Sequence, residues 1–297
     1  MENSSDVRAC VRVVKDHLYH WHDDITIVMV VEGIIKLRVW AKDNIMKSGD
    51  VLVLNQGEVH KLTAITEENL VVVVSFDRKF CLEACSGFEE SIILCNSVQY
   101  RNNNKEIYYE LQLKLRDLIY EYGKESCNCN TREKAKEIIG FLCYHFDYIS
   151  SGENHKRFSE YIIARNKLLY KKVFLEKSEL SEMSLKDLSS YLGVSYAYLR
   201  IDILERFGYG FSWLKYTLMT EKAARMMLTT NKRLIDISNQ CGFSDQKYLR
   251  KYIQKFFQCN PSEFRKQYKK QCKKDGYVEI PLQYIMRFCD KFRKLEE

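Results

Sequence analysis

The sequence predicts an α+β protein of two domains: an antiparallel β-barrel with a helical pair, then an all-α domain with two helix-turn-helix units. Three observations predict this fold class. Residues 7–75 contain short runs rich in Val and Ile, residues 105–149 repeat apolar side chains every three or four positions, and the helical part that follows carries the excess of positive charge. The length of 297 residues also suits two domains.

The first part of the chain has five apolar runs bounded by turn-forming residues. They are Val11–Val14, Ile25–Val31, Ile34–Trp40, Val51–Leu54 and Leu70–Phe76. Several short strands at such regular spacing are typical of an antiparallel sandwich or barrel. We therefore expect residues 1–104 to form a small barrel.

Two amphipathic helices are expected next, at 105–123 and 131–149. Leu111, Leu115 and Leu118 share one face of the first helix, and the second helix has a similar apolar stripe. We treat residues 105–150 as a helical connector, and residues 151–160, which are small, polar and charged, as a linker.

Charge divides the chain unevenly. Residues 1–160 hold 20 Lys and Arg against 25 Asp and Glu, whereas residues 161–275 hold 23 against 11 and residues 276–297 hold four of each. A basic half joined to an acidic half indicates that one half binds a polyanion, although a basic surface also arises for solubility alone.

The basic part contains one pattern twice. Ser184–Ser195 predicts a short helix that ends in a sharp turn at Gly193, and Tyr196–Phe207 predicts the next helix, with Ser195 as its cap. Arg233–Ser244 repeats the pattern around Gly242. A short helix, a glycine turn and a capped second helix define a helix-turn-helix unit.

The second helix of the later copy, at 245–257, has two different faces. An apolar stripe is made by Leu249, Tyr252, Ile253 and Phe256, whereas Gln246, Lys247, Arg250 and Lys251 project elsewhere. Such side chains suit base edges and phosphates in a major groove. A solvated charged face is the alternative for an isolated helix, but the duplication and the basic charge favour binding to DNA.

A signature extends over the second copy and beyond it. It comprises Ala223-Ala224, Leu228, Ile235, Ile237, Gly242–Asp245, Tyr248-Leu249 and Asn260–Arg265. In these residues the segment 184–265 resembles the DNA-binding domain of AraC-type transcriptional regulators. The resemblance implies two helix-turn-helix units joined by one long helix, here at Trp213–Thr229, which read adjacent major-groove segments of double-stranded promoter DNA.

The resemblance also implies site residues and partners. The DNA-binding positions carried over are Tyr196, Ala197, Arg200 and Ile201 in the first unit, and Gln246, Lys247, Arg250 and Lys251 in the second. It further implies a homodimer formed through the 105–150 helices, and contact with RNA polymerase, as made by an activator. Packing of these helices on their own barrel is the alternative to dimerisation.

The chain departs from the family pattern at three positions. Ile201 stands where the family usually has a basic residue, Met219 where it usually has Arg, and Gln258 where Gly is frequent. We therefore expect the first unit to be the weaker reader of bases. Contact between Ile201 and a thymine methyl group is the alternative for that position.

Three histidines of the first part resemble a pattern of the cupin superfamily. His20 and His22 form an H-x-H pair and His60 follows later, as in metal-binding cupins, but Thr26 stands near the place of their Glu ligand. Three histidines can bind a transition metal. Because the carboxylate is missing, we assign these histidines to a ligand pocket, with no metal and no cofactor, and expect no catalytic metal.

The sequence thus predicts a DNA-binding transcription regulator that is not an enzyme and responds to an unknown small-molecule effector in the barrel. The predicted DNA-binding domain is 161–268, and the tail 269–297 has no assigned role. The alternatives are a metal-dependent cupin enzyme with an appended basic domain and a regulator with a vestigial pocket.

We expect a cytoplasmic protein. The chain has no stretch of 18 uncharged apolar residues, no apolar signal core at its start, and 11 scattered cysteines that suit a reducing compartment.

Overall fold

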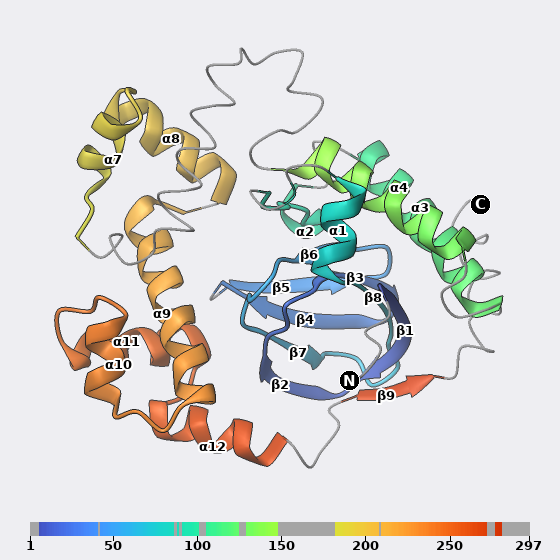
Figure 1. Cartoon of the computed structure of the whole chain (residues 1–297). Coiled ribbons are helices and arrows are strands. Elements are labelled where there is room, and N and C mark those ends of the chain that lie inside the picture. The colour runs from blue at the N-terminus through green and yellow to red at the C-terminus, as the bar shows by residue number, and fades with distance from the viewer. Residues whose placement is uncertain are drawn as a thin grey trace. The chain divides into compact units, whose positions relative to one another are not determined.

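The computed structural model describes residues 6–40, 42–85, 88, 91–100, 105–124, 129–147, 182–207, 209–271 and 277–280 (Figure 1). The described residues divide into two compact units. The first unit holds the residues up to 147, apart from a short stretch at 39–42, together with 277–280; the second holds 182–271 and that short stretch. The predicted linker 151–160 and most of the tail lie outside the described residues.

The first unit is built around an antiparallel sheet of five strands in the order β6-β3-β8-β1-β9. Their bounds are β1 Val7–Val14, β3 Ile25–Glu32, β6 Val51–Leu54, β8 Leu70–Phe76 and β9 Tyr277–Ile280. Strands β3 and β8 are buried almost throughout, which is why they read as continuous Val- and Ile-rich runs. The edge strand β9 comes from the far end of the chain and pairs with β1, with Val11 opposite Ile280.

A second sheet of four strands has the order β2-β7-β4-β5. Its strands are β2 Asp16–His20, β7 His60–Ala64, β4 Ile34–Val39 and β5 Lys42–Lys47. The predicted antiparallel β-domain is confirmed, but its described strands form two sheets, so the expectation of one closed barrel is corrected. Three of these strands (β2, β5 and β7) were missed, because they are short and carry polar side chains at alternate positions.

Among the described residues, four helices complete the first unit: α1 Arg78–Ala84, α2 Ser97–Tyr100, α3 Lys105–Lys124 and α4 Cys129–Phe146. The predicted helical pair is therefore confirmed as α3 and α4. Leu111, Leu115 and Leu118 are fully buried in one core with alternate side chains of the five-stranded sheet. This face of α3 packs within its own chain, so it is not available to a partner chain.

The second unit is entirely helical in its segment 182–271 (Figure 1). Its helices are α7 Leu185–Tyr191, α8 Tyr196–Phe207, α9 Phe211–Thr229, α10 Leu234–Gln240, α11 Gln246–Phe257 and α12 Pro261–Gln271. Helix α9 connects the two predicted pairs, and the Tyr216 ring on it stacks on Tyr252 of α11 with ring centroids 4.3 Å apart. The predicted pair of helix-turn-helix units is confirmed.

Among the helices of the described residues, none combines the length and the apolar character that crossing a membrane requires.

Candidate DNA-reading helices and ligand cavity

The two helix-turn-helix units use the same turn. Gly193 and Gly242, which end α7 and α10, have positive φ angles of 65° and 80°, a conformation that favours glycine. Two backbone hydrogen bonds close each turn in the same order: Gly193 N to Ser190 O (3.2 Å), Val194 N to Ser189 O (3.0 Å), Gly242 N to Asn239 O (3.1 Å) and Phe243 N to Ser238 O (3.0 Å). These are the two bonds of a Schellman motif, which explains why the sequence places glycine at both positions.

Side chains fix the start of each helix that follows a turn. The Ser195 hydroxyl accepts a hydrogen bond from Tyr198 N at 3.2 Å, and the Asp245 carboxylate accepts one from Lys247 N at 2.7 Å. Ser184 and Asp187 form a capping box at the start of α7. The cap of α11 is Asp245.

Helices α8 and α11 correspond residue by residue at a spacing of fifty positions. Both are 12 residues long. Their inward positions carry the same residue types, since Leu199 and Leu249 are 1% and 0% exposed and Ile203 and Ile253 are both 0% exposed. The two helices are therefore held by equivalent packing.

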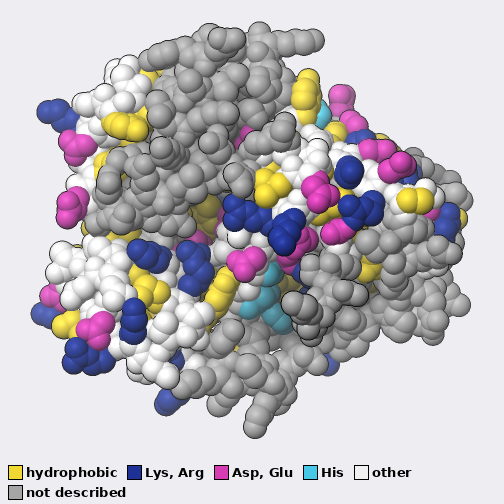
Figure 2. Space-filling view, viewed as in Figure 1, with side chains coloured by type: hydrophobic (Ala, Val, Ile, Leu, Met, Phe, Trp, Pro, Cys, Tyr) yellow, Lys and Arg dark blue, Asp and Glu magenta, His cyan; other side chains and the backbone are white. Residues whose placement is uncertain are grey.

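The outward positions of α11 are basic. Lys247, Arg250 and Lys251 are exposed and Gln246 is half-buried. Helix α11 has four Lys and Arg and no Asp or Glu, and Lys255, the fourth cation, lies over the Trp213 ring at 4.2 Å. Dark-blue Lys and Arg side chains dot the region of Figure 2 that α10 and α11 occupy in Figure 1. All four residues assigned to DNA on this helix thus share a face that can meet a polyanion.

The outward positions of α8 are mainly apolar. Tyr196 and Ile201 are 52% and 50% exposed, and Ala197 and Arg200 are also exposed. Two acidic residues balance two basic ones along this helix. The assigned residues share one accessible surface, but that surface lacks net charge.

Sequence reasoning missed one repeated exposed residue. Tyr198 on α8 and Tyr248 on α11 occupy corresponding positions and are both exposed. The signal was present, because the same aromatic residue recurs at the same place in both copies beside the buried leucine.

A cavity of about 510 Å³ lies in the first unit. Along the strands of the five-stranded sheet, residues that line the cavity alternate with residues that pack against the helices, because successive residues of a strand point to opposite sides. The polar lining residues are Arg8, Arg12, His17, His20, His22, Asp24, Thr26, His60 and Ser75, and the aliphatic ones are Ala9, Val14, Val28, Leu54, Leu62 and Val73. Its size and mixed lining suit a small-molecule ligand. Histidine side chains (cyan) reach the face of the molecule drawn in Figure 2.

The structure brings the three predicted histidines together in this cavity. One ring nitrogen of each lies within 4.8 Å of those of the other two. Each Nδ1 also meets a backbone carbonyl: His20 that of Leu18 at 3.0 Å, His22 that of Asp24 at 3.1 Å, and His60 that of Glu58 at 2.9 Å. A carbonyl only accepts hydrogen bonds, so these contacts favour the tautomer with the proton on Nδ1. The Nδ1 of His20 also lies 3.0 Å from the Nδ1 of His17, and that of His22 lies 3.5 Å from the Thr26 hydroxyl.

All three imidazoles are neutral at pH 7. Burial is the main cause that lowers the pKa of His20 to about 3 and that of His22 to about 4, and it holds the pKa of His60 well below its usual value. The nearby cations Arg8 and Arg12 lower the pKa of His22 further. The cluster therefore offers lone pairs rather than positive charge.

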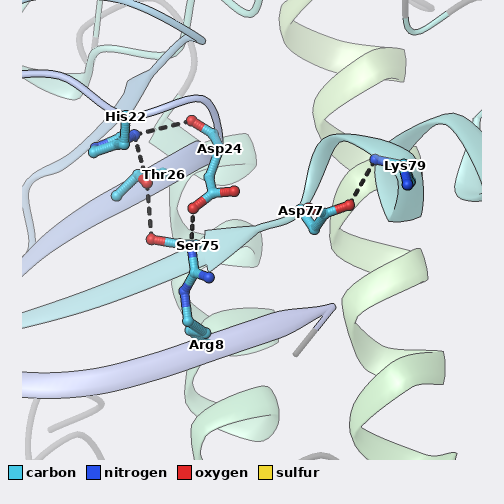
Figure 3. Close-up of polar contacts among 7 residues, drawn as sticks. All are labelled: Arg8, His22, Asp24, Thr26, Ser75, Asp77 and Lys79. Carbon is cyan, nitrogen blue, oxygen red and sulfur yellow. Dashed lines mark hydrogen bonds and ion pairs between the residues drawn. The ribbon is translucent and has the colours of Figure 1, made fainter. Parts of the chain in front are cut away.

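The position of the missing carboxylate is occupied by a hydroxyl pair (Figure 3). The Thr26 Oγ1 and Ser75 Oγ atoms are 2.8 Å apart, on adjacent strands of the five-stranded sheet. Beside them Arg8 forms an ion pair with Asp24, whose backbone carbonyl accepts from His22 (Figure 3). The Asp24 carboxylate is thus already engaged by an arginine.

The donor set fits a transition metal in type and number, and contacts between Nδ1 and a carbonyl are those that metal-bound histidines ordinarily make. It lacks the carboxylate of a catalytic cupin centre. The absence of a catalytic metal therefore stays a prediction, and it rests on Thr26.

Two family models match the chain. Residues 11–76 match a cupin domain and residues 188–267 match a helix-turn-helix domain. The first match covers β2 to β8 and the second half of β1, and the second covers most of α7, all of α8 to α11 and part of α12.

Curated relatives are helix-turn-helix-type transcriptional regulators of Staphylococcus aureus. The protein of strain MSSA476 is 21% identical over 221 residues, which are 73% of this chain and 28% of the relative. That of strain COL is 20% identical over 248 residues, 82% and 31% of the two chains. The chain thus spans less than a third of the length of these relatives.

The chain also aligns with solved structures. A ToxT structure from Vibrio cholerae O395 is 18% identical, covers 89% of this chain and 98% of its own, and has a TM-score of 0.45. The C-terminal domain of the response regulator yesN from Fusobacterium nucleatum is 31% identical over 33% of this chain and 96% of its own, with a TM-score of 0.31. The chain thus combines a cupin domain with a helix-turn-helix domain of the AraC type.

Proposed function

We propose that this protein binds double-stranded promoter DNA at specific sequences and that a small molecule in the cupin cavity controls the binding. The observation that carries the proposal is the exposed face of α11. It presents Gln246, Lys247, Arg250 and Lys251 on a helix that the preceding turn and cap hold rigidly.

The side chains of this face suit different tasks on DNA. Arg250 can donate two hydrogen bonds to one guanine edge, whereas Lys247 and Lys251 act as point charges toward phosphates. Helix α8 adds Arg200 and an apolar surface around Ile201 that suits thymine methyl groups. The proposed division of labour gives α11 most of the affinity and α8 a smaller share.

The effector is proposed for the cavity between residues of β1, β2, β3, β6, β7 and β8. Its lining combines histidines and arginines with aliphatic side chains, a combination that orients a ligand as well as burying it. An effector can alter DNA binding only by binding two conformations of the protein with different affinity.

The remaining partners belong to the same proposal. A homodimer would use the outer faces of α3 and α4, where Tyr109 and Tyr144 are exposed, since the leucine face of α3 is buried in its own chain. Contact with RNA polymerase and a cytoplasmic location accord with a transcription activator.

The direct experiment is selection of bound sequences from a random DNA library, followed by affinity measurements on the selected site and on single-base variants. We expect one preferred motif, with mismatches that each cost about 1–3 kcal/mol. Equal affinity for the selected site and for random DNA would contradict sequence-specific regulation.

The enzymatic alternative has one discriminating feature. Thr26 cannot act as the carboxylate ligand or base that cupin chemistry uses, so we propose that the chain is not an enzyme. Replacing Thr26 with Glu should leave DNA binding intact. Turnover of a small molecule by the unmodified protein, dependent on His20 and His22, would overturn this part of the proposal.

A further inference from the structure

The C-terminal strand β9 forms one edge of the five-stranded sheet (Figure 1). It pairs antiparallel with β1, so that Val278 lies opposite Val13 and Ile280 lies opposite Val11. Along the chain β9 follows α12 of the second unit, but it belongs to the first unit. The tail 269–297, which has no role assigned from the sequence, thus contributes a strand to the β-domain.

The hydrogen bonds of β1 show which of its backbone groups face β9. Alternate residues of an antiparallel strand direct their N–H and C=O groups to opposite sides. The backbone N–H and C=O of Val14 both bond the side chain of Asn69, the residue before β8, at 2.9 Å. The carbonyl of the next residue, Lys15, instead accepts a hydrogen bond from β7 at 2.7 Å. By this alternation, Val11 and Val13 direct their backbone groups away from β8 and toward β9.

Docking of β9 is expected to be weak enough to reverse. The strand has four residues, and of these Val278 and Ile280 lie opposite the residues whose backbone groups face it. The net gain from so few hydrogen bonds is comparable with the conformational entropy that four residues lose when they are ordered. Release would open the edge of β1 to water, including Val11, which is 1% exposed with β9 in place. Docked and released forms can therefore interconvert.

Helix α12 joins β9 to the second helix-turn-helix unit. The Phe264 ring on α12 packs against Phe257 of α11, with ring centroids 4.7 Å apart. The Arg265 guanidinium donates a hydrogen bond to the carbonyl of Lys232, just before α10, at 2.6 Å. A restraint on the end of α12 is therefore passed to both helices of this unit.

The connection between α12 and β9 is short. Five residues separate Gln271 from Tyr277, and such a connector spans at most about 20 Å. While β9 is docked, the second helix-turn-helix unit can thus adopt fewer orientations than when β9 is free. Binding of α11 in a major groove requires a particular orientation, so a restraint that disfavours this orientation opposes binding.

Strand β1 also contributes to the cavity lining, through Arg8, Arg12 and Val14. These side chains and the edge that β9 occupies belong to one strand. A ligand that shifts β1 therefore shifts the docking edge as well, which gives an effector a route to β9.

We propose that residues 277–280 form a detachable strap. Docked on β1, the strap restrains the second helix-turn-helix unit and lowers its affinity for DNA; released, it frees that unit. This inference rests on the proposed function, because it requires that α11 binds DNA, and it assigns a regulatory role to the C-terminal tail.

The test compares two proline variants of the full-length protein. Val278→Pro removes an N–H that faces β1, whereas Glu279→Pro, one residue further on, removes an N–H that faces away from β1. Hydrogen exchange of the Val11 and Val13 amides should therefore quicken in the first variant and stay slow in the second. Fluorescence anisotropy on the site selected from the random library should show DNA affinity raised by about 5-fold or more in Val278→Pro alone.

A reversible lock should give the opposite change. The Cα atoms of a hydrogen-bonded pair lie about 5.5 Å apart, which suits a disulfide, so Val13→Cys combined with Val278→Cys should hold the strap in place when oxidised. The oxidised double variant should bind DNA more weakly than its reduced form, with the unmodified protein, oxidised and reduced in the same way, as the control. Peptide mapping identifies the disulfide, and circular dichroism checks that all variants fold.

Each other outcome overturns a stated part. Fast exchange at Val11 and Val13 in the unmodified protein refutes docking, and equal exchange in the two proline variants refutes the register. Equal DNA affinity in variants whose exchange differs, or tighter DNA binding by the locked protein, refutes the inhibitory restraint. Absence of DNA binding in every protein refutes the proposed function itself and the inhibition with it, whereas hydrogen exchange still reports whether β9 docks.

Discussion

The two helix-turn-helix units share a scaffold and differ in the surface that they present. Their turns, their buried leucine and isoleucine and the lengths of α8 and α11 correspond. Outward, α11 has four basic residues and no acidic one, whereas α8 is neutral and apolar. The comparison teaches that inward positions preserve the fold of a duplicated unit, while outward positions are free to diverge in function.

The clearest single difference is the pair Ile201 and Lys251, at corresponding positions of α8 and α11. Both side chains are exposed, so neither is required for packing. A lysine can neutralise a phosphate, whereas an isoleucine can contact only apolar surface such as a thymine methyl. The two units should therefore differ mainly in how salt affects their contacts with DNA.

The largest effect is expected from removing the charge of α11. The triple variant Lys247→Gln, Arg250→Gln, Lys251→Gln should bind DNA far more weakly, and the slope of log K against log salt should fall in magnitude by about 0.9 for each phosphate that is no longer neutralised. Fluorescence anisotropy at several salt concentrations measures this. In the matched control, Arg200→Gln on α8, the slope should change by no more than about 1; equal weakening in both variants would contradict the division of labour.

Within α11 we expect two neighbouring cations to act differently. Arg250→Ala should cost about 1–3 kcal/mol and relax specificity at one base position, as expected for a bidentate base contact. Lys251→Ala should weaken binding to all sequences and lower the salt slope by about 1. Binding to the cognate site and to single-base variants at two salt concentrations decides. If both variants bind as the unmodified protein does and remain folded, α11 does not enter the groove.

A smaller change should make the first helix-turn-helix unit more like the second helix-turn-helix unit. Ile201→Lys adds a cation at an exposed position, so it should raise non-specific affinity and increase the salt slope by about 1 without altering stability. Anisotropy on random-sequence DNA measures it, with Ile201→Gln as the neutral control of similar size. An identical effect of both substitutions would mean that this position does not face phosphates.

The smallest expected effect is on stability, and it concerns only the second helix-turn-helix unit. Gln258 ends α11 with a positive φ of 57°, where the related pattern often has glycine. Gln258→Gly should stabilise the protein by about 1 kcal/mol, the strain of a left-handed conformation in a non-glycine residue. Lys255→Gly, inside the same helix, should destabilise it by about 1 kcal/mol. Thermal unfolding measures both, and a destabilising Gln258→Gly would show that the αL conformation costs nothing here.

Much of this architecture could be predicted from residues, and the failures have physical causes. Gly193 and Gly242 predicted their turns because few other residues adopt a positive φ. The buried strands could be predicted because continuous apolar runs mark strands that are covered on both faces. Strands β2, β5 and β7 could not be predicted, since their pairing partners decide their structure more than their own composition does.

The functional sites were harder to predict from the sequence than the fold. The pattern of His20, His22 and His60 predicted a shared pocket, and the cavity contains all three. The contacts of their Nδ1 atoms with backbone carbonyls leave no trace in the side-chain pattern. The arginines beside them come from β1, a strand with no pattern that links it to the histidines. On α3, helical periodicity predicted an apolar face but not whether a partner chain or the same chain covers it.

The most direct test of the account is the salt dependence of DNA binding by a fragment of residues 161–275, which carries the basic excess and both helix-turn-helix units. We predict that the isolated fragment folds, binds the site selected by the full chain, and loses affinity steeply as salt rises, with most of the slope removed by the α11 triple variant. A folded fragment with a flat salt response would contradict the claim that the basic face of α11 binds DNA.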